Sequence, residues 1–222
     1  MRDKQDLSAL LRLMAWLSPA FPIGSFAYSS GLERAAHDGL VINAATLGNW
    51  LSSIITHGAV WNDVVLMAEA HRSFGDATRS AECAALAEAL AGSRERHQET
   101  MLLGDAFLSA AAAWPQSAAA TPRNAAYPVA VGAVAAAHGV ACESAIAAYL
   151  HAVLSQGVSA AIRLSVCGQK GGVGVIAALE ETIILVASRA AETTLEDLGS
   201  AAIQADIVAL RHETQRVRLF RS

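Results

Sequence analysis

The chain has 222 residues, of which 54% are hydrophobic, 16% are charged and 5% are aromatic. This length favours a single domain around one substantial core, here predicted over residues 1–222. The net charge of −4 gives no basic footprint for nucleic acid or for an anionic membrane, so we expect neither as a partner. The three cysteines, Cys83, Cys142 and Cys167, are odd in number and far apart, which excludes a readable disulfide framework or a Cys-x-x-Cys metal pair. A reducing, cytoplasmic setting is the simplest expectation.

Alanine supplies much of the apolar content, which favours helix over strand. Leu10, Leu13, Met14 and Leu17 follow the spacing i, i+3, i+4, i+7 and predict a first helix that ends near Leu17. No segment alternates polar and apolar residues over a useful length, so the sequence requires no strand. We predict an all-α fold, a single compact bundle of roughly eight to ten helices with a flexible C-terminal tail over residues 210–222.

The next segment, residues 17–33, is the most constrained part of the chain and reads LSPAFPIGSFAYSSGLE. Pro19 and Pro22 fix their own φ angles and keep the residues before them out of the helical region. Gly24 permits a positive φ, and Ser25 is a candidate N-cap for a second helix. The sequence therefore predicts a rigid elbow after the first helix.

Further helices follow in chain order, separated by Gly, Pro and polar clusters. The second helix, capped by Ser25, should end near Asp38-Gly39, and Thr193-Thr-Leu-Glu196 has the form of a capping box for the last one. The stretches predicted to connect helices are 115–122, as a flexible break, and 168–174. The later helices are predicted at 46–73, 76–91, 93–113, 126–138, 143–166, 175–189 and from about 197 onward.

The mean hydropathy of +0.36 raises the question of a membrane span. Residues 144–162 contain no Asp, Glu, Lys or Arg and are long enough to cross a bilayer. They nevertheless contain His151, Gln156 and several serines, and they lack aromatic belts and a positive-inside bias. We interpret this stretch as a buried core helix.

No catalytic or metal-binding constellation is evident. The glycine-rich stretch 168–174 matches no phosphate-binding motif and reads as a turn between helices. The seven histidines form neither an i, i+4 pair on one helix face nor a His/Cys cluster. Ser25, Ser29 and Ser30 have no nucleophile elbow and no evident histidine base. We therefore predict no catalytic residue, no metal site and no tightly bound cofactor, with a helical enzyme of unrecognised site as the remaining alternative.

Two clusters of charge stand out in this charge-poor chain. The first, residues 94–99, is either a solvated helix face or a polar patch that meets a partner, and the sequence leaves both open. The second is the C-terminal tail, where basic residues surround Leu219 and Phe220. Such termini are usually solvated and mobile, but an aromatic anchor among basic residues suits docking to a partner. The candidate partner-binding residues of the tail are Arg211, Glu213, Arg216, Arg218, Leu219, Phe220 and Arg221.

The elbow sequence resembles the N-terminal signature of the UreF family of urease accessory proteins. Three further segments fit the same resemblance in the same order, namely RERHQETMLLG at 94–104, YPVAVG at 127–132 and RHETQRVRLFRS at 211–222. The resemblance spans essentially the whole chain, and its first and last segments are the most specific.

The resemblance implies a non-enzymatic maturation factor. Such a protein forms a homodimer, binds the accessory protein UreD (also called UreH), recruits the GTPase UreG through that complex, and acts on apo-urease. Nickel is then handled by the complex rather than by a site in this chain. An alternative within the same complex is a regulator that accelerates or restrains GTP hydrolysis by UreG.

Carried onto this sequence, the resemblance implies partner-binding roles for both ends of the chain. The tail matches the segment that helps hold UreD, so deleting residues 211–222 is expected to leave a folded helical protein that binds UreD more weakly. The elbow residues that match the family signature, with a role facing UreG expected for some of them, are Pro19, Phe21, Pro22, Gly24, Tyr28 and Glu33.

Overall fold

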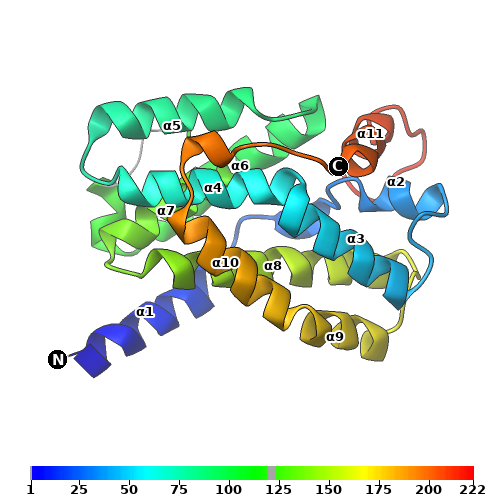
Figure 1. The fold of residues 1–222 in the computed structure, drawn as a ribbon, viewed down its shortest axis with the longest axis horizontal. Coiled ribbons are helices and arrows are strands. Elements are labelled where there is room, and N and C mark those ends of the chain that lie inside the picture. Colours follow the sequence, from blue (N-terminus) through cyan, green and yellow to red (C-terminus); the bar gives the residue numbers. More distant parts are fainter. Residues whose placement is uncertain (1, 120–123) are drawn as a thin grey trace.

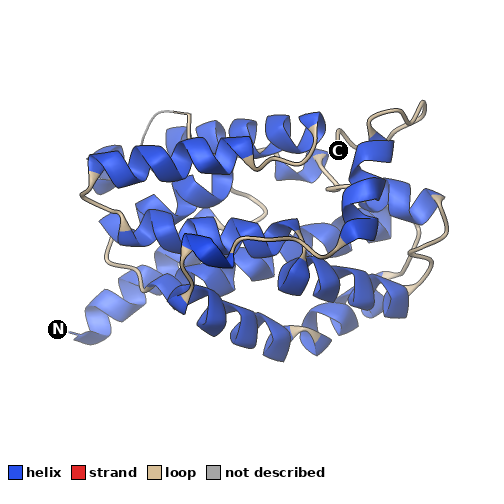
Figure 2. Cartoon of the chain, turned by 45° about the horizontal axis from the view of Figure 1, so that its top comes forward, coloured by secondary structure: helices blue, strands red, loops and turns tan. Residues whose placement is uncertain are grey.

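The computed structural model describes residues 2–119 and 124–222, and every regular element within these ranges is a helix (Figure 2). There are eleven α-helices and three short 3-10 helices in the described part. The all-α prediction is confirmed, with one α-helix more than the range that we expected. The α-helices are α1 (Arg2–Trp16), α2 (Leu32–His37), α3 (Ala44–His57), α4 (Ala59–Arg72), α5 (Ala77–Ala89), α6 (Arg94–Ala111), α7 (Tyr127–Ala137), α8 (Cys142–Arg163), α9 (Gln169–Ala178), α10 (Glu180–Glu192) and α11 (Ile203–His212). The 3-10 helices are η1 (Ser25–Ala27), η2 (Pro115–Ala119) and η3 (Leu195–Asp197).

Helix α4 lies at the centre of the molecule, with α3, α5, α7, α8 and α10 packed around it (Figure 1). Helix α7 packs closely against α4. There is no room for a side chain at Gly132 of α7, since a Cβ there would lie 2.3 Å from the carbonyl oxygen of Met67 on α4. Glycine and alanine on α7 allow the two backbones to approach closely. The small side chains of the alanine-rich sequence therefore allow α7 to pack closely against α4.

Helix α8 is the long apolar segment that raised the membrane question. Among the described residues, α8 is the one helix that is by itself long and apolar enough to span a bilayer. Helices α9 and α10 reach the required length only when they are counted as one span with a 42° bend. Ile146, Leu150 and Leu154 of α8 are fully buried against neighbouring helices. This burial is what the interpretation of α8 as a core helix requires.

The elbow differs from the prediction in its second half. Gly24 has a positive φ of 75°, as expected, but Ser25 does not cap a helix that carries Glu33. Positive φ angles at Ser30 (51°) and Gly31 (82°) interrupt the chain after η1, and α2 begins only at Leu32. The backbone therefore turns twice between the first helix and α2.

The long helix predicted at 46–73 is two helices, because the chain breaks at Gly58. A Cβ on Gly58 would lie 2.9 Å from Cα of Ile54, so only glycine fits the bend between α3 and α4. Helix α3 also starts earlier than predicted, because Asn43 is its N-cap and forms a capping box with Thr46.

The glycine-rich stretch 168–174 was predicted as a turn, but most of it is the first part of α9. A Cβ on Gly172 would lie 2.6 Å from Cγ1 of Val158, so the missing side chain lets α9 pack closely against α8. Tertiary packing therefore overrides the low helix propensity of glycine.

The capping box near residue 194 is also shifted from its predicted position. Thr194, not Thr193, is the N-cap, Asp197 is its partner, and the pair opens η3 instead of the last α-helix. Helix α11 begins six residues later at Ile203. The predicted break at 115–122 contains η2 in its first half, and its remainder lies outside the described residues.

Candidate functional site: the elbow–tail junction

The C-terminal segment is packed against the body of the protein, which corrects the prediction of a flexible tail. After α11 the chain turns back toward η1 and α2 and ends beside them (Figure 1). Phe220 and Ser222 are only 4% exposed. We call this region the elbow–tail junction and define it as residues 24–33, Glu95 and Glu99 of α6, and residues 212–222.

Glu33 of α2 is the acceptor that fixes the backbone of the tail. Its Oε1 accepts a hydrogen bond from the backbone N–H of Leu219 at 2.7 Å, and its Oε2 accepts one from the N–H of Phe220 at 2.9 Å. Glu33 is itself buried, and a buried carboxylate needs such donors to offset the loss of its hydration. The predicted elbow residue thus binds the predicted tail.

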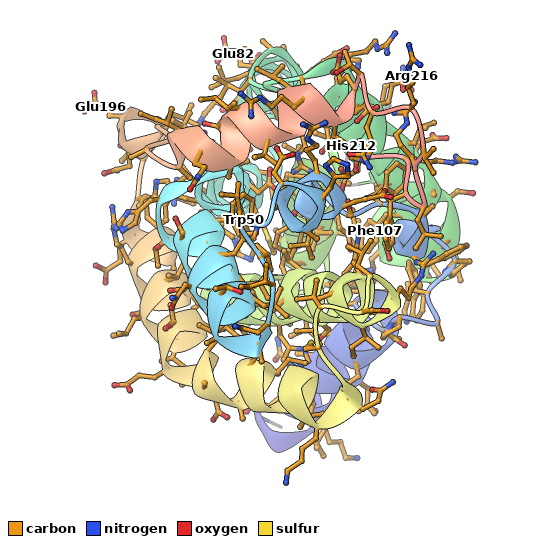
Figure 3. The ribbon with its side chains drawn as sticks, turned by 90° about the vertical axis from the view of Figure 1, so that its right-hand side faces the viewer. Trp50, Glu82, Phe107, Glu196, His212 and Arg216 are labelled. Carbon is orange, nitrogen blue, oxygen red and sulfur yellow. The ribbon has the colours of Figure 1, made fainter. Side chains whose placement is uncertain are left out.

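His212, the last residue of α11, lies between two carboxylates and is fully buried (Figure 3). Its Nδ1 is 2.7 Å from Oε2 of Glu95, and its Nε2 is 3.3 Å from Oε2 of Glu33. Arg218 also pairs with Glu95. His212 therefore connects α2, α6 and α11 through one side chain.

The end of the chain is held by serines and by Glu99. The hydroxyl of Ser222 donates to Oε2 of Glu99 at 2.8 Å, and the hydroxyl of Ser30 donates to Oε1 at 3.0 Å. Ser29 donates its backbone N–H to the carbonyl oxygen of Ser222 at 2.9 Å, and its hydroxyl bonds the same oxygen. The positive φ of Ser30 is part of the geometry that presents these donors.

Beneath the junction, Arg96 of α6 forms ion pairs with Asp63 of α4 and with Glu99. Burial alone would lower the pKa of Arg96, but the two carboxylates outweigh burial and raise it. Tyr149 donates to Oδ2 of Asp63 at 3.0 Å, and burial together with the Asp63 charge raises the pKa of Tyr149. Arginine therefore stays protonated and tyrosine stays neutral at physiological pH.

Phe220 anchors the tail on the side of α8. The guanidinium of Arg163 lies 4.3 Å from the centre of the Phe220 ring, a cation–π arrangement. Arg163 also donates to the carbonyl oxygen of Phe26 at 2.6 Å, and Gln156 donates to the carbonyl oxygens of Ser25 and Tyr28 at 2.8 and 3.1 Å. The last turns of α8 hold η1 and the tail together.

The outer side of the junction presents apolar side chains to solvent. Phe26 is 73% exposed, Val217 is 86% exposed and Leu219 is 54% exposed. Arg216 and Arg221 are exposed beside them, with Arg216 at the outer edge of the molecule (Figure 3). An apolar surface with a basic rim is suited to a protein partner with an acidic rim.

The structure brings only some of the predicted site residues together. Glu33 and the tail residues Arg218, Leu219 and Phe220 are in direct contact, either with one another or through Glu95. Glu213 joins the junction because its Oε1 accepts the backbone N–H of Glu95 at 3.2 Å. Residues that face solvent at the periphery are Pro19, Pro22, Arg211, Arg216 and Arg221.

Two of the three aromatic residues of the elbow, Phe21 and Tyr28, pack against the core. Phe21 is half-buried and its ring centre lies 5.6 Å from that of Phe107, which Figure 3 labels, and 6.4 Å from that of Trp114. Tyr28 is 6% exposed. Tyr28 is thus covered and Phe21 partly covered, and direct partner binding by these two residues stays a prediction.

The sequence analysis missed the residues that join the two ends of the chain. Glu95 and Glu99 lie in the charge cluster at 94–99, but they are 7% and 3% exposed, which rules out a solvated face for these two. Their i, i+4 spacing puts them on one helix face, but that spacing does not tell whether the face points inward. His212 carried no comparable signal, because its partners are distant in sequence.

The junction does not resemble a metal site. Among the described residues, no group of three or more His, Cys, Asp or Glu side chains is arranged to hold a metal ion. The carboxylates are instead occupied by backbone N–H groups, hydroxyls, arginines and His212. These contacts hold the C-terminal segment against the elbow and α6.

Comparison with known proteins finds the same family that the two terminal segments of the sequence resemble. A sequence model of the UreF family matches residues 41–180. A curated relative from Rhizobium etli, "Urease accessory protein UreF", is 64% identical over 223 residues and aligns over the full length of both chains. The chain belongs to the UreF family of urease accessory proteins.

Other UreF relatives align over the full length of both chains as well. Those from Agrobacterium fabrum and Rhizobium meliloti carry the same name and are 57% and 55% identical to this chain. The family model stops short of the elbow and the tail, whereas these full-length matches include them. The elbow–tail junction therefore lies within the part of the chain that UreF relatives share.

Proposed function

We propose that the chain is a non-enzymatic scaffold for nickel insertion into urease, which bridges UreD (UreH) and the GTPase UreG and acts with them on apo-urease in the cytoplasm. Membership of the UreF family supports a role in urease maturation. The bridging role and the homodimeric state are our proposal. In this proposal, nickel passes through the assembly without a tight site in this chain.

The proposal rests on the difference between the two sides of the elbow–tail junction, one charged and buried, the other apolar and exposed. Its inner side is a network of buried charges that holds the tail in one conformation. Its outer side exposes Val217, Leu219 and Phe26. A tail that is ordered before binding loses less conformational entropy when a partner docks. The junction thus supports a role as a preformed surface for UreD.

Membership of a family of accessory proteins supports a non-enzymatic role. The buried ionisable groups of the junction pair with one another or with groups of the tail, which accounts for them as structural residues. Catalysis would require a positioned group facing a substrate.

Complementation tests the proposal. The chain is expressed in cells that carry a matched urease operon without its UreF gene, and urease activity and nickel content are measured. We expect nickel-loaded, active urease. Absence of rescue despite soluble expression and intact partner genes would contradict the role in urease maturation.

A second candidate function is control of GTP hydrolysis by UreG. It is favoured by the exposed Arg216 and Arg221, since an arginine supplied by a partner can stabilise the charge of a phosphoryl-transfer transition state. The test compares the GTPase rate of UreG in the full complex with the native chain and with Arg216→Ala and Arg221→Ala. A rate that is the same with and without the native chain would contradict this candidate.

A further inference from the structure

Both ring nitrogens of His212 face carboxylate oxygens. Nδ1 lies 2.7 Å from Oε2 of Glu95, and Nε2 lies 3.3 Å from Oε2 of Glu33. An ionised carboxylate can only accept hydrogen bonds, and a neutral imidazole has a single N–H to donate. A neutral His212 would therefore turn a nitrogen lone pair toward one of the two carboxylates. Only the doubly protonated ring, the imidazolium ion, donates to both.

The other contacts of these two carboxylates are those of ionised groups. Both oxygens of Glu33 accept backbone N–H groups of the tail, and Oε1 of Glu95 pairs with the guanidinium of Arg218. All four carboxylate oxygens therefore act as acceptors. The second proton that the two contacts of His212 require thus belongs to the imidazole ring.

The charges around and beneath His212 also favour a cation at this position. Among the described residues, two guanidinium groups, on Arg96 and Arg218, pair with the buried carboxylates of this region. These carboxylates are those of Glu33, Asp63, Glu95 and Glu99. A neutral His212 would leave buried negative charge uncompensated, which is costly, and a protonated His212 reduces it.

The sequence neighbours of His212 do not reverse this balance. Arg211 is exposed and pairs with Asp38 at 3.7 Å. Glu213 adds a further carboxylate, whose Oε1 accepts the backbone N–H of Glu95 at 3.2 Å. His212 is also the last residue of α11, and the C-terminus of a helix favours positive charge. Helices α2, α6 and α11 thus all present acceptors or negative charge to the ring.

We infer that His212 is an imidazolium ion in the folded protein and that its proton holds the tail in the packed conformation. When the tail detaches, His212 reaches water, where a histidine loses its proton near pH ~6.5. Above that pH the packed form keeps a proton that the detached form lacks, so a rise in pH favours detachment. The hold on the tail is complete below about pH 6.5 and weakens toward alkaline pH.

No other side chain type that ordinarily titrates near neutral pH occurs in the junction. The junction, as defined above, contains no lysine and no cysteine, and His212 is its single histidine. The pH-sensitive contact is therefore confined to one residue. The inference goes beyond the proposed scaffold function and does not depend on it, because the isolated chain contains every group involved.

Nuclear magnetic resonance of ¹⁵N-labelled histidine rings in the full chain tests the protonation state directly. At pH ~7.5 an ordinary histidine is mostly neutral, so we expect protons on both ring nitrogens of His212 and on a single ring nitrogen of the exposed His57 and His151. Comparison with the spectrum of His212→Gln assigns the signals. A bare ring nitrogen in His212 at this pH would overturn the inference.

Trypsin measures how firmly the tail is held. Cleavage after Arg216 and Arg218 in the native chain is compared at each pH with cleavage of a free peptide of residues 211–222, which corrects for the pH dependence of the protease. Because detachment releases a proton, the ratio of the two rates should rise at least about tenfold between about pH 7 and about pH 9. A ratio that does not change over this range would contradict the inference.

Two histidine variants separate His212 from general effects of pH. His212→Gln cannot take up a proton, so its tail should be cleaved faster than that of the native chain at pH ~7, with a ratio that stays constant up to pH ~9. His151→Gln, the same change at an exposed position of α8, should behave as the native chain does. A rise in the ratio for His212→Gln as large as that for the native chain would count against His212. If His212→Gln does not fold, the ring protonation and the ratio for the native chain still decide.

Discussion

Glu33 and Phe220 are 187 positions apart in the chain, yet Oε2 of Glu33 accepts the backbone N–H of Phe220 at 2.9 Å. The neighbouring N–H of Leu219 donates to the other oxygen of the same carboxylate. Glu33 therefore holds the main chain of the tail in register, beside the side-chain anchors Phe220 and Arg218. The elbow and the tail form one structural unit.

Replacing Glu33 by Gln tests this relationship. Glutamine keeps the size but removes the charge and one acceptor, so a backbone N–H of the tail loses its partner. We expect the free energy of unfolding to fall by about 1–3 kcal/mol and trypsin to cleave after Arg216 and Arg218 more rapidly. Denaturant titration and limited proteolysis measure both effects. Glu82→Gln on the exposed face of α5 is the control and should change neither.

Phe220 should contribute stability, whereas its neighbour Leu219 should not. Phe220 is 4% exposed and packs on Arg163, so Phe220→Ala should cost about 3 kcal/mol of folding free energy. Leu219 is 54% exposed, so Leu219→Ala should change the free energy by no more than about 0.5 kcal/mol. Chemical denaturation of the two variants decides. Equal costs would show that the tail is not anchored as described.

Gly132 of α7 and Gly174 of α9 give a matched pair of substitutions that tests the packing of the core. Gly132→Ala places a Cβ against the Met67 carbonyl and should lower Tm strongly, since neither backbone can move aside at low cost. Gly174→Ala meets no atom within 4 Å and should stabilise α9 by about 0.5–1 kcal/mol. Thermal unfolding distinguishes them, and a neutral Gly132→Ala would contradict the close contact of α4 and α7.

His138 should make the protein less stable in mild acid. Burial, and to a smaller extent the charge of Arg12, lowers the pKa of His138 below its ordinary value of 6.5. The unfolded chain therefore binds a proton more readily than the folded chain, and stability present above pH 6.5 is lost as the pH falls toward the folded pKa. His138→Gln should reduce the loss of Tm between about pH 7 and about pH 5. The exposed variant His151→Gln serves as control, and an unchanged pH profile of His138→Gln would count against this account.

The sequence predicted the helical class and most helix positions, because apolar periodicity and caps are local signals. It also placed constrained residues correctly at Gly24 and at the end of α1. It could not predict that residues 169–174 are helical, since this depends on the close approach of Gly172 to Val158. Likewise, the burial of Glu95 and His212 follows from contacts between segments more than a hundred residues apart.

The elbow–tail junction shows which kind of feature the sequence predicts and which kind it does not. Both of its halves stood out in the sequence as unusual in composition, and both matched the family's terminal signatures. Their contact with each other was not predicted, because the acceptor on Glu33 meets backbone groups that carry no sequence signal. The tail was therefore expected to be a flexible segment that docks on a partner, whereas the structure shows it packed on its own chain.

The most direct test of the central claim is the affinity of UreD for the outer side of the junction. Binding is measured for the native chain, for Val217→Asp and Leu219→Asp, and for Ile184→Asp, a control at a 56% exposed position of α10. Each new carboxylate in the tail adds a charge that must be desolvated on docking, so we expect at least about a tenfold loss of affinity for both tail variants and none for the control. Full affinity of both tail variants, with helical content and Tm unchanged, would contradict the proposal that this surface binds UreD.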